Sequence, residues 1–331
     1  MKLAIAGGGL IVKTVAAFLP GWGWEVEAIC VTPQGADAAW ELARQCGCPA
    51  VYTDYERMLE EVEAKVVYVA VPNHLHFAMA RKALERGLHV ILEKPITSND
   101  TEARILAELA RGRGLFLWEA ITTLYQPNYA TLKANLGRIG QVKLVSCNFS
   151  QYSSRYDAFC AGQTPPVFDR EKSGGTLMDL NLYNLHWLMG LFGEPEAVEY
   201  HPNLHRGIDT SGVLTLHYPG FQAVSIAAKD CGAPCRYVIQ GTRGYILQTA
   251  PANVCGEVVV HLNDGAEERF DTPTGHRLEA EFAVFARQLA EHDLDGCYRM
   301  LEHNLAVCRV QTRARLGAGI VFPADKIEGH F

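Results

Sequence analysis

The chain opens with MKLAIAGGGLIV (residues 1–12), a short apolar run that leads into three glycines and then into a helical pattern. Glycines after a first strand let the backbone approach a pyrophosphate and point the N-terminus of the next helix at its charge. The stretch therefore predicts a dinucleotide-binding turn. Because Val12 replaces the usual small residue at the third position, a purely structural strand–helix turn is the alternative. The residues expected to contact the cofactor here are Gly7, Gly9, Leu10 and Ile11.

Residues 1–118 alternate short apolar runs with amphipathic helical segments. The expected strands are Lys2–Ala6, Glu25–Val31, Ala50–Tyr52, Lys65–Val71, Leu88–Leu92 and Leu115–Trp118. The expected helices include Ala36–Cys46, His74–Arg86 and Asp100–Gly112. Such alternation is typical of right-handed βαβ units around a parallel sheet, and six strands fit a doubly wound Rossmann domain of the α/β class.

Beyond Trp118 the pattern indicates an α+β domain. Strand-like runs separated by turn signals predict a large, mostly antiparallel sheet built from hairpins. The runs are Gln141–Gln151, Ala197–His201, Ser211–Tyr218, Gln222–Ala228, Arg236–Gln240, Tyr245–Leu247 and Glu257–Leu262. Helices are expected at Asn128–Leu136, Thr176–Phe192, Leu278–His292 and Met300–Leu316. We predict a dinucleotide-binding domain over residues 1–120 and a substrate-binding and dimerisation domain over residues 121–331.

Composition excludes several classes of protein. A chain of 331 residues with 48% hydrophobic and 20% charged residues is not disordered. The net charge of −7 argues against nucleic-acid or membrane-surface partners, which need a basic stripe. Apolar runs are too short to span a membrane and the first residues lack a signal-peptide cleavage region, so we expect a cytoplasmic protein. The ten cysteines lack zinc-ligand spacing and are interpreted as free thiols, with no metal site.

Two motifs follow the fourth and fifth expected strands, where ligands of open α/β sheets bind. They predict further cofactor contacts from Pro72, Asn73, His76, Glu93 and Lys94. An ordinary exposed loop lysine is the alternative for Lys94. The end of the second strand lacks the acidic residue that binds the ribose 2′-hydroxyl of NAD and the arginine that binds the 2′-phosphate of NADP. Thr32 or Gln34 could form a hydrogen bond with either cofactor. NAD and NADP therefore both remain open.

A third cluster lies on the helix expected from Thr176. Asp179, Tyr183 and His186 are spaced i, i+4 and i+7, which places them on one face of an α-helix. The stripe lacks the Lys, Glu and Arg of a typical solvated face, so we favour a cleft-facing stripe that binds substrate over a solvent-facing one. The preceding polar loop, Gln151–Asp169, offers Arg155 as a further substrate-binding residue, with a plain surface loop as the alternative.

Together these motifs resemble the Gfo/Idh/MocA family of NAD(P)-dependent dehydrogenases over nearly the whole chain. The motifs are the N-terminal glycine turn, Pro72-Asn73 with His76, Glu93-Lys94-Pro95, the helix start at Gly174–Asp179, and Gly241-Thr242-Arg243-Gly244. Tyrosine at position 183, where many members have histidine, is similar to the branch that contains dihydrodiol dehydrogenase. Leu124 stands where that branch has arginine.

The resemblance implies a lysine, Lys94, beside the nicotinamide and a proton-donating Tyr183. A free tyrosine has a pKa of ~10, and an adjacent ammonium lowers it. Because Lys94 ends a strand of the first domain and Tyr183 lies on a helix of the second, we expect the two residues to meet across an inter-domain cleft. Asp179 would hold Lys94 or bind a substrate hydroxyl, and His186 is the competing acid–base group. The expected reaction is hydride transfer between nicotinamide and a sugar-like or related hydroxy or carbonyl substrate, with a diketone or trans-dihydrodiol as the variant. A non-catalytic dinucleotide-binding sensor is the alternative.

The resemblance also implies that copies of the chain assemble into an oligomer. The open antiparallel sheet of such second domains often forms a dimer interface, and few helices are expected here to cover both faces of the sheet. An apolar sheet face that is left open is a natural two-fold contact. We therefore expect a homodimer or a higher homo-oligomer.

Overall fold

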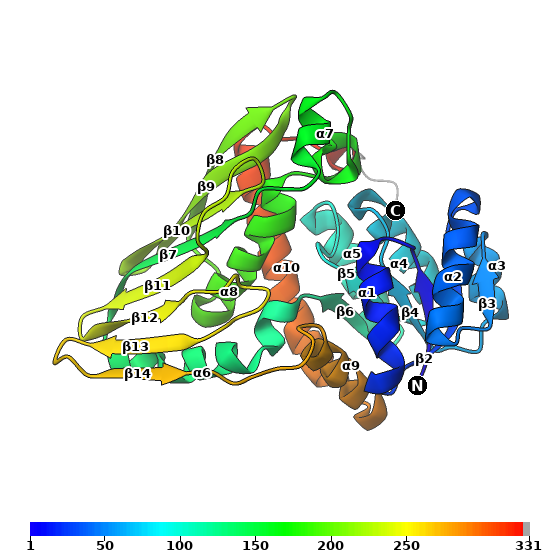
Figure 1. Ribbon diagram of the computed structural model, residues 1–331, viewed down its shortest axis with the longest axis horizontal. Coiled ribbons are helices and arrows are strands. Elements are labelled where there is room, and N and C mark those ends of the chain that lie inside the picture. The colour runs from blue at the N-terminus through cyan, green and yellow to red at the C-terminus, as the bar shows by residue number, and fades with distance from the viewer. Residues whose placement is uncertain (327–331) are drawn as a thin grey trace. The chain divides into compact units, whose positions relative to one another are not determined.

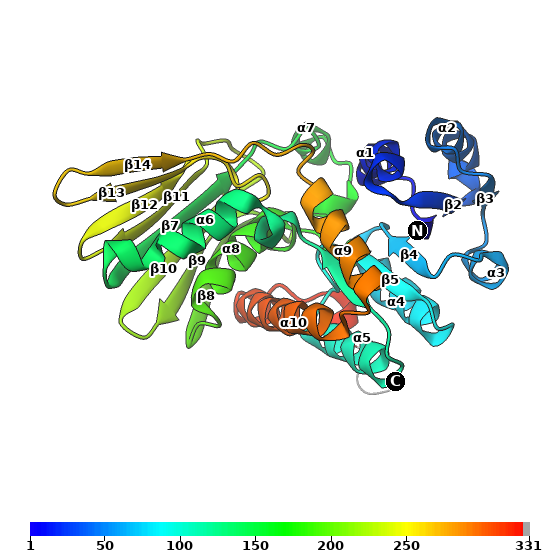
Figure 2. The ribbon, with the colours of Figure 1, turned by 90° about the horizontal axis from the view of Figure 1, so that it is seen from below.

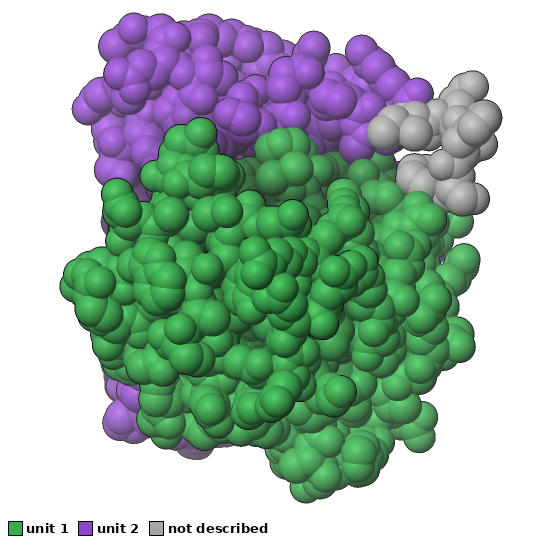
Figure 3. Space-filling view, turned by 90° about the vertical axis from the view of Figure 1, so that its right-hand side faces the viewer, with its two compact units in different colours: residues 1–120, 278–305 green, residues 121–277, 306–331 purple. Residues whose placement is uncertain are grey.

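The computed structural model describes residues 1–326. It divides into two compact units (Figure 3). Unit 1 comprises Met1–Ala120 with Leu278–Leu305, and unit 2 comprises Ile121–Arg277 with the residues from Ala306 onward. The break after Ala120 coincides with the boundary expected from the sequence.

Unit 1 contains a six-stranded parallel sheet in the order β3-β2-β1-β4-β5-β6, the strand order of dinucleotide-binding doubly wound domains (Figure 1). The strands are β1 (Lys2–Ala6), β2 (Glu25–Cys30), β3 (Ala50–Tyr52), β4 (Val66–Val69), β5 (His89–Glu93) and β6 (Leu117–Ala120). The helices are α1 (Leu10–Phe18), α2 (Ala36–Cys46), α3 (Tyr55–Glu61), α4 (His76–Glu85), α5 (Asp100–Gly112) and α9 (Glu279–Glu291). The central residues of β1, β4 and β5 are apolar and fully buried, as expected where helices cover both faces of a parallel sheet. The predicted Rossmann fold is confirmed.

The segment Leu278–Leu305 belongs to unit 1 although it follows unit 2 in sequence, which differs from the boundary drawn at residues 121–331. Its aromatic residues explain the placement. Phe282 packs edge-on against Trp24 and Tyr68, with ring centroids 6.3 and 5.6 Å away. Trp118 Nε1 donates a hydrogen bond of 2.7 Å to Gln288 Oε1. The segment therefore completes the core of the dinucleotide-binding unit.

Unit 2 contains an eight-stranded sheet in the order β14-β13-β12-β11-β7-β10-β9-β8 (Figure 1). The strands are β7 (Val142–Ser150), β8 (Ala197–His205), β9 (Ile208–Tyr218), β10 (Phe221–Ala228), β11 (Arg236–Gly241), β12 (Gly244–Gln248), β13 (Val258–Leu262) and β14 (Glu267–Phe270). Every pairing is antiparallel except β7 with β10, so the predicted mostly antiparallel sheet is confirmed. Edge strand β14 was not predicted, because its sequence EERF lacks the apolar alternation of a half-buried strand.

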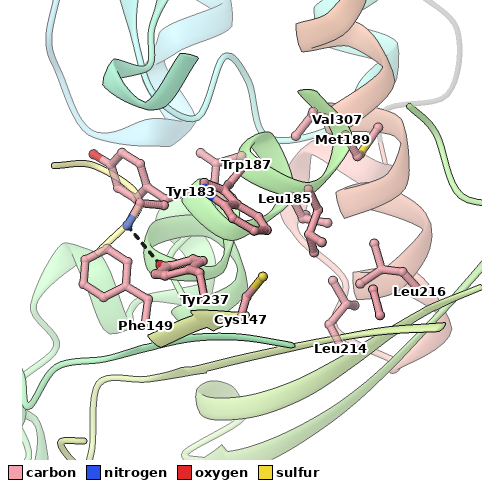
Figure 4. Packing of buried hydrophobic residues seen from close by; sticks show 14 of the residues in the cluster. Cys147, Phe149, Tyr183, Leu185, Trp187, Met189, Leu214, Leu216, Tyr237 and Val307 are labelled. Carbon is pink, nitrogen blue, oxygen red and sulfur yellow. Dashed lines mark hydrogen bonds between the residues drawn. The ribbon is translucent and has the colours of Figure 1, made fainter. Parts of the chain in front are cut away.

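Helices α6 (Pro127–Asn135) and α8 (Leu182–Phe192) lie on one face of this sheet (Figure 2). Beneath α8, Leu185 and Trp187 pack against sheet residues such as Cys147 and Tyr237 (Figure 4). A short helix, α7 (Tyr156–Cys160), lies in the expected polar loop. Helix α10 (Leu294–Gly317) contributes its first part to unit 1 and its second part to unit 2.

The other face of the unit 2 sheet carries large exposed apolar side chains. Leu144 is 51% exposed, and Val213 and Ile226 are each 37% exposed. Ile226 pairs with Val213 across β10 and β9, which makes the two side chains neighbours on this face. Among the described residues, none of the helices combines the length and apolarity needed to cross a lipid bilayer.

Candidate functional site

The glycine turn after β1 has two glycines with different structural requirements. Gly7 has φ +131°, and a Cβ there would lie 2.1 Å from the carbonyl oxygen of Ala70. Gly9, with φ −72°, is the N-cap of α1 and has open space within 4 Å of a Cβ position. It has no side chain to cap the helix, so the first amides of α1 are presented to a ligand. Next to them, Leu10 is 72% exposed. The turn therefore fits a pyrophosphate.

Val12, which departs from the glycine motif, is fully buried inside the turn. Its Cγ2 lies 3.5 Å from the position that a Cβ of Gly7 would occupy. The valine therefore fills the space below the turn and leaves its outer side clear.

The end of β2 adjoins the glycine turn. A Cβ at Gly8 would lie 3.0 Å from Val31 Cγ1, and Val31 precedes Thr32. Thr32 is exposed and precedes a 3₁₀ turn over Pro33–Gly35. A neutral hydroxyl at this position selects neither a ribose hydroxyl nor a phosphate.

His76 has a structural role that differs from its predicted cofactor contact. It is fully buried at the start of α4, after the Pro72-Asn73 turn. Its Nδ1 lies 2.7 Å from the carbonyl oxygen of Pro95, and its Nε2 lies 2.9 Å from that of Val71. Burial lowers the pKa of His76 to about 4. The ring therefore lies between the loops after β4 and β5, and a neutral imidazole donates its one N–H to one of the two carbonyls. Its contact with the cofactor stays a prediction.

The segment that carries Lys94 is held by two buried carboxyl groups. Glu93 accepts a hydrogen bond of 2.5 Å from the Tyr68 hydroxyl, which turns its side chain inward. Glu119, on β6, accepts a hydrogen bond of 2.9 Å from the Ile96 amide. Burial raises the pKa of Glu119 to about 8, and the charge of Lys94 acts in the opposite direction. Sequence reasoning did not assign Glu119 to the site, although an acid inside the apolar run LFLWEA is a signal of function.

Asp179, Tyr183 and His186 are not on one regular α-helical face. Residues Leu177–Asn181 form a π-helical turn, which widens the spacing before α8 begins at Leu182. Tyr183 is 6% exposed and His186 is fully buried, so the alternative of a solvent-facing stripe is wrong. The Tyr183 ring lies 6.0 Å from that of Phe149, and its hydroxyl points away from the other labelled core residues (Figure 4).

Asp179 forms an ion pair with Lys229, a residue that sequence reasoning missed. The Lys229 side chain is 4% exposed and that of Asp179 is 26% exposed. The Lys229 ammonium also lies 5.2 Å from the ring centroid of Phe168. A lysine directly after the apolar strand β10 is the sequence signal that could have identified it.

The start of the π-helical turn is anchored by Asp209. Its Oδ2 accepts hydrogen bonds from the Leu177 amide at 2.7 Å and from the Tyr200 hydroxyl at 2.8 Å. A Cβ at Gly175 would lie 2.1 Å from Asp209 Oδ1, so only glycine allows the carboxylate to reach the turn. Burial raises the pKa of Asp209, while these hydrogen bonds favour its ionised form.

The predicted substrate loop is fastened to the turn between β8 and β9. Arg206 donates hydrogen bonds to the carbonyl oxygens of Phe159 and Gln163, at 2.8 and 2.7 Å. The Tyr156 hydroxyl lies 3.3 Å from His205 Nδ1. Arg155 is exposed on this loop, beside the start of α7. The loop is therefore an ordered part of unit 2.

Comparison with protein families matches both parts of the chain. The model of an oxidoreductase family with an NAD-binding Rossmann fold (GFO_IDH_MocA) matches residues 1–121. The model of a GFO/IDH/MocA C-terminal domain matches residues 133–247. The two matches follow each other in the order expected from the sequence motifs.

Relatives of known sequence extend along most of the chain. Scyllo-inositol 2-dehydrogenase (NADP(+)) IolU of Bacillus subtilis is 32% identical over 304 residues, which cover 91% of this chain and 92% of the relative. Trans-1,2-dihydrobenzene-1,2-diol dehydrogenase of Sus scrofa is 26% identical and covers 98% of this chain and 99% of its own.

Solved structures share the fold. Levoglucosan dehydrogenase in complex with NADH and levoglucosan aligns with a TM-score of 0.84 at 18% identity, covering 96% of this chain and 97% of that chain. The 3-ketoreductase KijD10 of Actinomadura kijaniata in complex with NADP aligns with a TM-score of 0.83 at 22% identity, with the same coverage.

Proposed function

This chain belongs to the Gfo/Idh/MocA family of NAD(P)-dependent oxidoreductases, and we propose that it interconverts a secondary hydroxyl and a carbonyl group of a polyol or sugar-like substrate. We further propose that Lys94 and Tyr183 assist the proton transfer. The observation that carries the proposal is the orientation of Tyr183, whose ring is anchored in the core while its hydroxyl points out of it (Figure 4).

The residues divide the work of the reaction. The bound nicotinamide supplies or accepts the hydride at the carbinol carbon. In the oxidative direction the substrate hydroxyl loses a proton to the Tyr183 oxygen, and in the reductive direction that oxygen returns it. The Lys94 ammonium stabilises negative charge on the phenol oxygen and on the reacting oxygen. Asp179 accepts a hydrogen bond from a neighbouring substrate hydroxyl.

The cofactor is held through unit 1. The amides at the start of α1, beyond Gly9, bind the pyrophosphate, and Leu10 and Ile11 cover it. Pro72 and Asn73, at the carboxyl end of β4, border the nicotinamide half. Thr32 contacts the adenosine ribose. NAD and NADP are both compatible with this arrangement.

Two measurements test the proposal. Calorimetry with NADH and NADPH determines cofactor affinity. A substrate panel of scyllo-inositol, levoglucosan and trans-1,2-dihydrobenzene-1,2-diol, followed at the nicotinamide absorbance, determines activity; we expect turnover of the polyols. A protein that binds the cofactor but converts no member of the panel would favour the non-catalytic sensor.

We also propose a homodimer formed through the open face of the unit 2 sheet. Apolar patches of this kind on soluble proteins mark contact surfaces, and a two-fold axis lets one patch cover another copy of itself. The outward residues of neighbouring strands form the patch: Leu144, Val213, Val224, Ile226, Val238 and Leu247.

A further inference from the structure

The ion pair between Lys229 and Asp179 is unequal in its burial. The lysine side chain is 4% exposed, whereas the carboxylate is 26% exposed. The ring of Phe168 lies beside the ammonium and removes water from it. The lysine is thus a buried support, and the carboxylate is the part of the pair that a small molecule can reach.

Stability alone explains this pair poorly. The free-energy cost of removing two charges from water is about as large as the gain from their attraction. Replacing a buried ion pair by well-packed apolar residues of similar size therefore often leaves the protein equally stable. What the pair provides is a carboxylate whose position is determined by a buried cation.

The pair joins the π-helical turn to the sheet close to Tyr183. Asn181, in the same turn, accepts a hydrogen bond of 2.5 Å from Ser225 Oγ on β10. Lys229 directly follows β10, so the turn is bound to one strand at two points. Irregular π-helical turns occur frequently at functional sites, where they redirect side chains. Here the irregular turn carries the carboxylate that precedes Tyr183 by four residues.

We propose that Lys229 is a positioning residue that holds Asp179 in place as a hydrogen-bond acceptor for a hydroxyl next to the reacting carbon of a polyol. The inference rests on the proposed function, because it specifies how the same site recognises its substrate. Substrates that lack the neighbouring hydroxyl gain nothing from the pair, so the lysine contributes to specificity.

The test measures scyllo-inositol binding to the NADPH-loaded full-length protein by calorimetry. A hydrogen bond to a charged group corresponds to roughly 10- to 100-fold in affinity. Lys229→Met is expected to weaken scyllo-inositol binding by about this factor and to leave NADPH affinity unchanged. Lys229→Arg, which keeps the charge, is expected to restore most of the affinity. Lys143→Met removes an exposed lysine of β7 and serves as the matched control.

The double variant separates positioning from direct contact. If Lys229 acts through Asp179, adding Lys229→Met to Asp179→Asn causes no further loss of affinity. This comparison also replaces the single variant if the unpaired aspartate prevents Lys229→Met from folding. Three results would each overturn the inference. The first is that the losses of affinity in Lys229→Met and Asp179→Asn add fully in the double variant. The others are an unchanged affinity in folded Lys229→Met and a wild type that binds NADPH but not scyllo-inositol. If the binding results are as expected but the protein does not turn over scyllo-inositol, the proposed function is contradicted and the inference about Lys229 is not.

Discussion

At the scale of single residues, the two ends of the cofactor turn make opposite demands on glycine. Gly7 is required by the fold, because φ +131° and the carbonyl of Ala70 at 2.1 Å exclude a Cβ. Gly9 has an ordinary backbone conformation and open space around it, so the fold does not need glycine there. We attribute the glycine at this position to the proposed approach of an anionic ligand to the helix N-terminus.

Because of this contrast, we expect a substitution at Gly7 to lower folding stability and a substitution at Gly9 to abolish cofactor binding. Gly9→Asp is expected to retain the thermal midpoint within a few degrees but to abolish NAD(H) and NADP(H) binding, by charge repulsion and by blocking the turn. Gly7→Ala is expected to lower the thermal midpoint markedly, since strain and overpacking each cost roughly 1–3 kcal/mol. Calorimetry and thermal unfolding of both variants check this. Unchanged cofactor affinity in Gly9→Asp would contradict the assignment of the turn.

A second prediction at this scale concerns the acid–base group. Tyr183→Phe removes only the hydroxyl and is expected to lower kcat by ~10²–10⁴-fold with cofactor affinity unchanged. Lys94→Ala is expected to cost at least as much, and the two losses are expected to be less than additive because the residues act as a unit. Steady-state kinetics of the single and double variants provide the measurement.

His186 is the comparison residue for that experiment. It is fully buried, whereas the Tyr183 hydroxyl points out of the core (Figure 4). His186→Gln is therefore expected to affect folding stability more than turnover. Loss of turnover in His186→Gln together with retained turnover in Tyr183→Phe would transfer the acid–base role to the histidine.

At the scale of elements, the short segment Lys94–Ile96 after β5 is held from two sides. His76, at the start of α4, contacts the Pro95 carbonyl, and Glu119, on β6, accepts from the Ile96 amide. Two neighbouring elements thus contact the backbone that directly follows Lys94. The support depends on buried titratable groups, so its stability depends on pH.

Glu119→Gln tests this support. The pKa of Glu119 is raised from 4.5 to about 8, so the folded state holds a proton on Glu119 that the unfolded state releases, and the contribution of Glu119 to stability falls as pH rises from about 4.5 to 8. Glutamine keeps an acceptor for Ile96 and removes this penalty. The variant is therefore expected to gain stability over the wild type with rising pH, by roughly a few kcal/mol near pH 8. Urea unfolding at pH 5 and pH 8 measures it; a difference that does not change with pH would contradict the buried, protonated state.

At the scale of the whole molecule, the open face of the unit 2 sheet carries exposed apolar side chains on neighbouring strands. Ser146 pairs with Val224 on one side and with Val238 on the other, so apolar side chains flank it across the sheet. Leu144, on the same strand, is 51% exposed. Water contact at such a face is unfavourable, which favours self-association.

The homodimer is tested by charge insertion. Leu144→Arg combined with Val224→Arg places four cations in a two-fold interface, because each copy contributes both. Light scattering at micromolar concentration is expected to give twice 36.5 kDa for the wild type and 36.5 kDa for the variant. Lys143→Gln, on the same strand, is the control and is expected to remain dimeric. A wild type that is monomeric under these conditions would refute the proposal.

Local signals in the sequence determined much of this protein. Apolar runs alternating with amphipathic segments predicted all six strands of the first sheet, and the bounds of the helices Ala36–Cys46 and Asp100–Gly112 were predicted correctly. These features depend on periodicity, capping residues and glycine turns, which act over a few neighbouring positions. The glycine turn and the motifs after β4 and β5 indicated the dinucleotide-binding class for the same reason.

Only the tertiary structure decided which polar residues are supports and which are presented to ligands. Lys229 and Asp179 are 50 residues apart in sequence, and His76 and Pro95 are 19 apart. The π-helical turn and the return of Leu278–Leu305 to unit 1 likewise follow from packing. The role of a buried polar side chain depends on partners that the fold brings together, and a local signal such as the lysine after β10 does not show which residue is its partner.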